Sequence, residues 1–226
     1  MKFNLIRSIG VVVCAGLLIA GCATDKAGDK PKFSGYLGDY SNLEPIKGEG
    51  GDEIRRWVNP KLKKGQYTKL QVDPIVFYPA PQASKQVTLD TLYKSRRYAD
   101  EALRRELAKS YLIVHQAGPG VARVRIALTG ITTEPEKLKS YEYVPMAAIA
   151  AGIATATGAR DRQAFVLVEA EVQDSVTNEV LGRAVRKAPA KKLLPNDKEE
   201  LTFAMIKPLL DEKADNARRA LDRYLK

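Results

Sequence analysis

The alternation of apolar and polar residues predicts a chain of mixed helix and strand. Over residues 88–109 the apolar side chains recur at helical spacing, which is typical of a helix with one buried face. Thr88 is placed to cap the N-terminus of this helix. A second helix is expected to begin at Pro208, a residue suited to a first helical position, and to run to about Leu225.

Alternating residues and turn-forming residues predict about five strands. A strand over 67–78 is expected to lie at an edge or to break at Pro74, which has no N–H to donate to a sheet. Two hairpins are expected after the first helix, one over 111–129 around a Gly-Pro-Gly turn and one over 164–187 around a polar turn. Residues 44–66, which include a glycine-rich stretch, are expected to form a loop.

The strands of both hairpins have one apolar and one charged face, which favours an antiparallel sheet. We therefore expect an α+β domain, an antiparallel sheet of about five strands with helices on one face. The charged face would meet solvent. There, Arg123 and Arg125 would lie opposite Glu169 and Glu171, because both pairs have the same two-residue spacing.

The N-terminal segment has the plan of a secretory signal: a cationic start and an apolar run over 9–20, too short to span a bilayer. The tetrapeptide Ile-Ala-Gly-Cys that ends at Cys22 resembles a bacterial lipobox. This resemblance implies removal of the lipoprotein signal peptide 1–21, a diacylglycerol on the Cys22 thiol and an N-acyl chain, typically palmitate, on the new amine. An ordinary signal peptide with an incidental cysteine is the alternative.

Several acyl chains on one cysteine would anchor the protein to a membrane without spanning it. Residues 22–32 then form a flexible polar tether, and 33–226 form a single periplasmic α+β domain with an N-terminal arm at 33–66. Ala23 stands where an aspartate would retain such a lipoprotein at the inner membrane. The same resemblance therefore implies the inner leaflet of the outer membrane, facing the periplasm.

The charge is moderately positive, with 37 Lys and Arg against 27 Asp and Glu and a formal net charge of +10. In a periplasm the anions available to a basic protein are lipid headgroups and cell-wall polymers, so no nucleic-acid partner is expected. The simpler interpretation, that the charge only keeps the protein soluble, is preferred.

Two segments are candidate contact surfaces for a partner. The first is the aromatic start of the arm, and the second is an uncharged stretch of small residues at 144–158. This stretch could pack on the sheet, form a partner or self-association surface, or touch the membrane. The candidate contact residues are Phe33, Tyr36, Tyr40, Ala148, Ala151 and Ala154.

The residue inventory offers little support for catalysis. His115 is the only histidine and is expected to be packed in a strand, and no cysteine follows Cys22. Triads with histidine and a zinc site are therefore disfavoured, and no cofactor or metal is expected. Three carboxylate pairs remain as candidates for hydrolase chemistry: Glu134 with Glu136, Glu169 with Glu171, and Glu199 with Glu200.

Short motifs along the chain resemble an uncharacterised family of bacterial lipoproteins, the domain of unknown function 3313 (DUF3313). They include Ser-Gly-Tyr-Leu at 34–37, Tyr-Thr-Lys-Leu at 67–70 and the Asp-Ser step at 174–175. The resemblance covers nearly the whole mature chain and implies no catalytic residues.

We therefore expect a non-enzymatic accessory or assembly lipoprotein that binds an envelope protein partner. Binding to cell-wall polymer or anionic lipid headgroups through basic residues is the alternative. A carboxylate-based hydrolase is the third hypothesis.

Overall fold

The described part of the chain forms two helices and one sheet of eight strands. The computed structural model describes residues 33–48, 52–83, 87–135, 162–189 and 202–226. All of them belong to one compact unit, Pro31–Lys226. The predicted signal peptide, the predicted tether and the segment 144–158 lie outside the described residues.

The sheet is mixed, with an antiparallel part and a parallel part. The strands are β1 (Glu44–Lys47), β2 (Glu53–Val58), β3 (Lys69–Val72), β4 (Val76–Phe77), β5 (Leu112–Val114), β6 (Val121–Pro135), β7 (Arg162–Asp174) and β8 (Val180–Pro189). Their order is β1-β2-β8-β7-β6-β3-β5, and β4 also pairs with β6. The neighbours β1-β2, β2-β8, β8-β7 and β7-β6 are antiparallel. In the rest of the sheet, β3 and β4 run parallel to β6, and β5 runs parallel to β3.

The expectation of about five strands is wrong, in part because residues 44–66 are not all loop. They contain β1 and β2, and β2 extends the sheet by pairing with β8. These strands are short, and β1 lies at the edge of the sheet. Their alternation is weak, and the pairing with β8 identifies them as strands where local sequence does not.

The prediction of a hairpin over 111–129 is also wrong. Both β5 and β6 run parallel to β3, which lies between them. The expected turn is present, with Gly120 at φ +71. It belongs to the connection from β5 to β6, which crosses the end of β3. The strand expected over 67–78 does break at Pro74, giving β3 and β4, which both pair with β6.

The hairpin over 164–187 is confirmed as β7 and β8. Its turn is held by Asp174, whose Oδ1 accepts from the N–H groups of Val176 at 2.9 Å and Thr177 at 2.8 Å. Asn178 adopts a φ of 59, a conformation that asparagine tolerates better than most residues.

The first helix matches its prediction closely, as α1 (Leu89–Leu107), and the Thr88 side chain accepts from the N–H of Thr91. The second, α3 (Phe203–Leu225), begins before Pro208, which lies inside it. That start is favoured by tertiary packing, because the Phe203 ring meets the Tyr98 ring of α1 edge-on, with centroids 5.4 Å apart.

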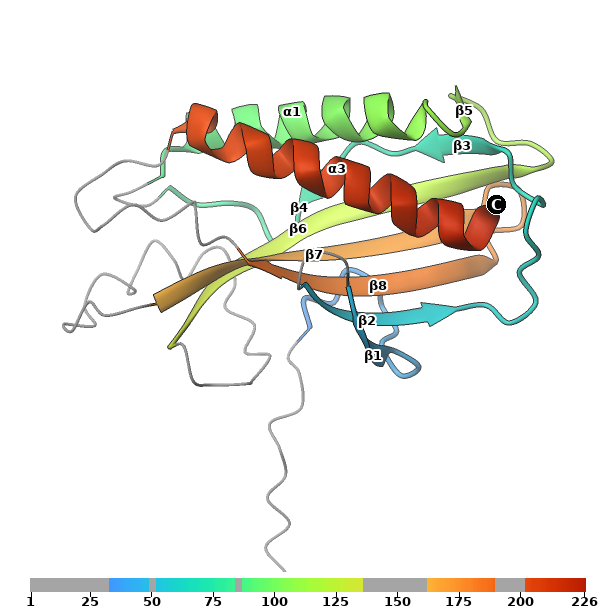
Figure 1. The fold of residues 1–226 in the computed structure, drawn as a ribbon, viewed down its shortest axis with the longest axis horizontal. Helices are drawn as coiled ribbons and strands as arrows, with labels where there is room; N and C mark the ends of the chain where they lie inside the picture. The colour runs from blue at the N-terminus through green and yellow to red at the C-terminus, as the bar shows by residue number, and fades with distance from the viewer. Residues whose placement is uncertain (1–32, 49–51, 84–86, 136–161, 190–201) are drawn as a thin grey trace, which may run out of the picture. The chain divides into compact units, whose positions relative to one another are not determined.

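The two helices lie side by side over the sheet (Figure 1). Apolar residues from both helices and from β3, β6 and β8 build one core, which includes Leu70, Val72, Leu103, Leu107, Val124, Leu181 and Leu225. Leu181 joins it through a bulge, because the β7–β8 register shifts there and turns its side chain toward the helices.

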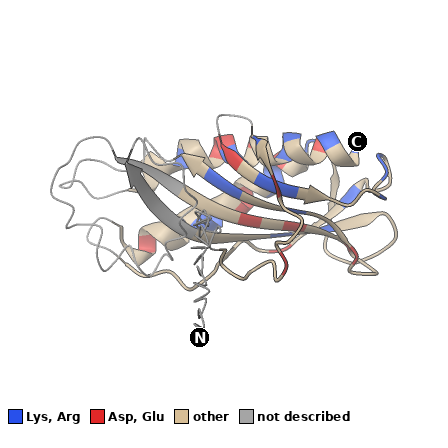
Figure 2. Cartoon of the chain, turned by 90° about the horizontal axis from the view of Figure 1, so that it is seen from below, with Lys and Arg blue, Asp and Glu red and all other residues tan. Residues whose placement is uncertain are grey.

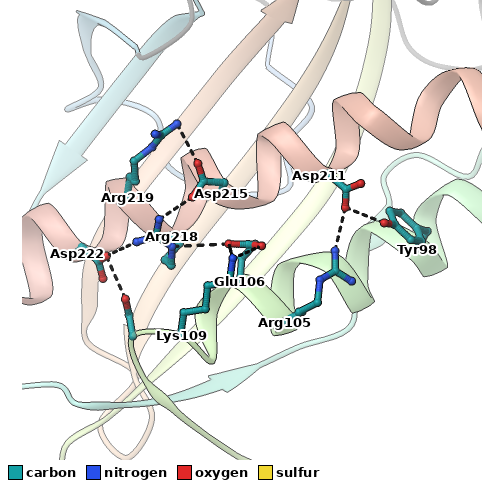
Figure 3. A network of polar contacts seen from close by, with 10 residues as sticks. Tyr98, Arg105, Glu106, Lys109, Asp211, Asp215, Arg218, Arg219 and Asp222 are labelled. Carbon is teal, nitrogen blue, oxygen red and sulfur yellow. Dashed lines mark hydrogen bonds and ion pairs between the residues drawn. The ribbon is translucent and has the colours of Figure 1, made fainter.

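Ion pairs join the helices outside this core (Figure 3). Asp211 of α3 accepts from Tyr98 at 2.7 Å and from Arg105 at 2.9 Å, both on α1. Arg218 of α3 is paired with Asp222 at 2.9 Å within its own helix and lies 3.8 Å from Glu106 of α1. These contacts fix the alignment of one helix along the other.

Asp52 provides a buried link between α3 and the β2 side of the sheet. Its carboxylate is fully buried, 2.9 Å from Lys213 of α3 and 3.5 Å from Arg186 of β8. A buried carboxylate needs such partners, since an unpaired charge away from water is strongly destabilising.

We predict that Asp52→Ala lowers the free energy of unfolding by about 3 kcal/mol, because it leaves two largely buried cations without this carboxylate. Urea denaturation measures the change. Asp90→Ala is the control, since it removes an exposed pair with Lys94 and should leave the stability nearly unchanged. Equal small losses in both variants would contradict the role given to Asp52.

Candidate functional site

The sheet face expected to meet solvent carries buried charges. Glu169 is 1% exposed and Glu171 is 2% exposed, so the prediction of a wet face is wrong at these positions. Val124 and Val172 face the helices on the other side. Figure 2 views the sheet from below and shows acidic and basic positions close together on its strands.

The start of the N-terminal arm covers this face. Leu37 and Leu43 of the arm are buried against Val185 of β8, and the half-buried Phe33, Tyr36, Tyr40 and Trp57 pack around them. The Phe33 and Tyr40 rings stack with centroids 4.3 Å apart. A tight turn folds the arm back on itself, with Gly35 at φ +94. A residue with a Cβ would be strained in this backbone conformation.

Glu169 fastens the arm to β7. Its Oε1 accepts from the backbone N–H of Ser34 at 3.0 Å, and its Oε2 accepts from the Tyr40 hydroxyl at 2.7 Å. Burial, and secondly the hydrogen bond to Glu169, raise the pKa of Tyr40 to about 12. The arm thus supplies a hydrogen-bond donor to each oxygen of a buried carboxylate.

Glu171 is held by its neighbours on the sheet. It accepts from Arg125 at 2.8 Å, from Gln173 at 2.8 Å and from Arg183 at 2.7 Å. The expected pairing of Arg125 with Glu171 is confirmed, and the two residues are directly opposite in register. The expected pairing of an arginine with Glu169 is wrong, because Arg123 lies opposite Gln173 and binds Asp73 of the β3–β4 connection at 2.8 Å.

These contacts leave the Glu169 and Glu171 carboxylates engaged in structural bonds on both oxygens. Of the other candidate acids, Glu136, Glu199 and Glu200 lie outside the described residues. Glu134 lies in β6 opposite Gln163, and its side chain is outside the described part of the structure.

His115 is exposed directly after β5, so the prediction of a packed histidine is wrong. Across residues 33–48, 52–83, 87–135, 162–189 and 202–226, no three His, Cys, Asp or Glu residues gather as metal ligands would. Within those same ranges no helix has the length and apolar character needed to cross a membrane.

The arm also forms an aromatic and basic surface, which we call the Tyr–Arg surface and define as Tyr36, Tyr78, Arg123 and Arg125. The Tyr36 and Tyr78 rings have centroids 5.7 Å apart, and the Arg125 guanidinium lies 5.4 Å from the centre of the Tyr36 ring. Tyr78 is 42% exposed. Burial raises the pKa of Tyr36, so its hydroxyl group is uncharged at neutral pH.

The structure locates three of the six predicted contact residues. Phe33, Tyr36 and Tyr40 are half-buried on the sheet, so only part of each side chain is available to a partner. Ala148, Ala151 and Ala154 lie outside the described residues. Their role in contacts stays a prediction.

Sequence reasoning missed a pocket beside the arm. The pocket is lined by residues of the arm, by Trp57 of β2, by Asn59 just after β2 and by Arg183 of β8. The interpretation of 44–66 as loop hid the pairing of β2 with β8, which places Trp57 directly opposite Arg183.

Comparison with known proteins identifies relatives along most of the chain. Residues 32–217 match the family model described as protein of unknown function (DUF3313). The chain is 34% identical over 205 residues to the uncharacterized lipoprotein YdcL of Escherichia coli K12, and the match covers 91% of each protein. YdcL of Escherichia coli O157:H7 matches equally well.

Likeness to solved structures is weak. The PelC dodecamer from Paraburkholderia phytofirmans aligns with 77% of this chain and 99% of its own at a TM-score of 0.35 and 13% identity. Neither fold nor assembly is inferred from so low a score.

We predict that Tyr40 makes stability fall at alkaline pH. Its pKa is about 12 in the folded protein against an ordinary 10.0, so its contribution is complete below pH 10 and is lost as the pH rises toward 12. Across this window, the free energy of unfolding should fall less steeply for Tyr40→Phe than for the unchanged protein, as measured by urea denaturation.

Tyr67 provides the comparison for this experiment, because burial and a bond to Asp174 raise its pKa to about 12 as well. Tyr67→Phe should remove a separate part of the alkaline slope, and the double variant should show the sum of both effects. An unchanged slope in Tyr40→Phe would contradict the arm contact with Glu169.

Proposed function

The chain belongs to the DUF3313 family of proteins of unknown function, and we propose that it is a lipid-anchored lipoprotein that binds a protein partner in the bacterial envelope. Cys22 would carry the diacylglycerol and N-acyl chain, typically palmitate. A relative that is 34% identical and named a lipoprotein supports this assignment. Ala23 favours the inner leaflet of the outer membrane, with the domain in the periplasm.

The arm defines where the proposed tether would join the domain. Ser34 is bonded to Glu169, so the tether would leave the domain at the sheet face opposite the core that packs on the helices. Residues 22–32, fully extended, reach about 38 Å. The attachment point would therefore lie within about 40 Å of the membrane.

The Tyr–Arg surface is the observation that carries the binding proposal. Protein interfaces are enriched in tyrosine and arginine, which combine apolar area with hydrogen bonding. Here Tyr78 and the neighbouring Val76 of β4 are exposed, at 42% and 40%. Bonds to Asp73 and Glu171 hold the two arginines in place, so the surface is preorganised for a partner.

A binding role is also favoured over catalysis by the bonds that Glu169 and Glu171 already make. Contact with cell-wall polymer or anionic lipid ranks second, since many described basic residues are already paired with carboxylates. Arg104, Arg105, Lys109, Arg123, Arg125, Arg183 and Lys213 are examples.

We predict that Cys22→Ser releases the protein from the membrane. Without the thiol no thioether to diacylglycerol can form, so the protein should move from the membrane to the soluble fraction. Mass spectrometry of the mature chain should show acyl groups on Cys22 and none in the variant. Cys14→Ser is the control and should keep the anchor; an unmodified Cys22 would contradict the assignment.

We predict that a photoreactive residue in place of Tyr78 forms one discrete adduct with a protein of the intact envelope. The same group in place of Leu112, which is 62% exposed on β5, should form none. In-cell crosslinking followed by gel analysis and mass spectrometry measures both.

Two valine variants test whether the adduct depends on the Tyr–Arg surface. Val76→Asp should remove it, because Val76 of β4 and Tyr78, which directly follows β4, are two residues apart and both exposed. Val176→Asp makes the same change at a valine 58% exposed in the β7–β8 turn and should retain the adduct. Equal adduct formation in both variants would rule out this surface as the binding site.

A further inference from the structure

A half-open pocket of about 280 Å³ lies where the arm meets β2 and β8. This is small for a site that binds organic ligands, which commonly have about 300–1,000 Å³. Its lining combines one aromatic wall with several planar polar side chains: Trp57, Asp39, Asn42, Asn59, Glu179 and Arg183. The pocket is separate from the Tyr–Arg surface, and its role does not depend on the proposed function.

Arg183 forms a fixed polar element of this pocket. Its Nε donates to Glu171 at 2.7 Å, and its Nη1 donates to the Asp39 carboxylate at 3.0 Å. Asp39 is in turn held by the backbone N–H of Ser41 at 3.0 Å and the Ser41 hydroxyl at 2.7 Å. The Ser41 bonds hold the pKa of Asp39 below its ordinary value, so the pair is charged at neutral pH.

Asn59 and Glu179 form a second fixed element. The Asn59 amide donates to Glu179 at 2.9 Å and to the Val180 carbonyl at 3.1 Å, while its own oxygen accepts from the N–H of Lys61 at 2.9 Å. Asn59 is buried whereas Glu179 is exposed. A buried amide with three bonds therefore orients a carboxylate at the pocket surface, before any ligand arrives.

Trp57 supplies the apolar wall. Its half-buried indole packs against the cluster of Leu37, Leu43 and Val185, which prevents it from turning freely. It lies directly opposite Arg183 in the β2–β8 register, so the flat ring and the fixed guanidinium border the same space.

The charges of the lining disfavour an anionic ligand. Arg183 is paired with two carboxylates, so it offers little excess charge to a phosphate or a carboxylate. The lining carboxylates Asp39 and Glu179 already accept hydrogen bonds from Arg183 and Asn59, and a cation is the competing ligand that the test below separates. Hydrogen-bond donors and acceptors beside a flat apolar ring match a sugar ring with its hydroxyl groups and C–H face. We propose that this pocket binds a pyranose unit of a neutral saccharide.

Trp57 also makes the proposal directly measurable, because it is the only tryptophan in the chain. The mature, detergent-solubilised protein is titrated with glucose, galactose and N-acetylglucosamine while tryptophan emission is recorded. At least one sugar should change the emission saturably, with a Kd of about 1 mM, as is typical of so small a ligand. Saturation-transfer NMR on the same samples detects contact independently of fluorescence.

Two exposed residues allow the site to be tested without loss of the fold. Asn42→Ala and Glu179→Gln should each weaken binding about tenfold, since the first removes a polar contact with the ligand and the second replaces a charged acceptor with a weaker neutral one. Glu212→Gln makes the same charge change on α3, away from the pocket lining, and should leave the Kd unchanged.

The proposal is overturned if none of the three sugars gives a saturable response in either measurement, or if Glu179→Gln and Glu212→Gln bind equally well. A saturable response to spermidine but to no sugar would overturn it too, and would assign the pocket to cations. An emission change that grows linearly with sugar concentration counts as no binding.

Discussion

The burial of two carboxylates on one face of the sheet is the constraint on which the rest of this structure depends. A carboxylate removed from water without partners is strongly destabilising, so Glu169 and Glu171 require donors from several directions. Arg125 and Arg183 supply them from neighbouring strands, and Ser34 and Tyr40 supply them from the arm. The arm is therefore part of the domain.

The docked arm builds two different surfaces from one short segment. Tyr36 lies against Tyr78 and Arg125, which makes an aromatic and basic surface near β4. Asp39 lies against Arg183, which closes one side of the pocket beside Trp57. Both surfaces thus depend on the docking through Glu169, and both lie in the region where the proposed lipid tether would leave the domain.

Local pattern was sufficient for α1 and for the β7–β8 hairpin. The helical spacing around Thr88 and the turn at Asp174 define α1 and the β7–β8 hairpin, and both form as expected. Local pattern failed where pairing with a distant strand defines the element. β1 and β2 depend on β8, and β5 pairs with β3 and not with β6, which follows it in the chain. Pro208 similarly marked a helix start that packing of Phe203 moved earlier.

The sequence by itself determined the family, α1, most of α3 and the β7–β8 hairpin, because short motifs and the spacing of neighbouring residues carry them. The tertiary structure alone decided which face of the sheet is buried and which residues line the pocket. Alternation along β7 separates its two faces but does not say what covers each one. The covering arm lies more than a hundred residues away, and only folding brings Ser34 to Glu169.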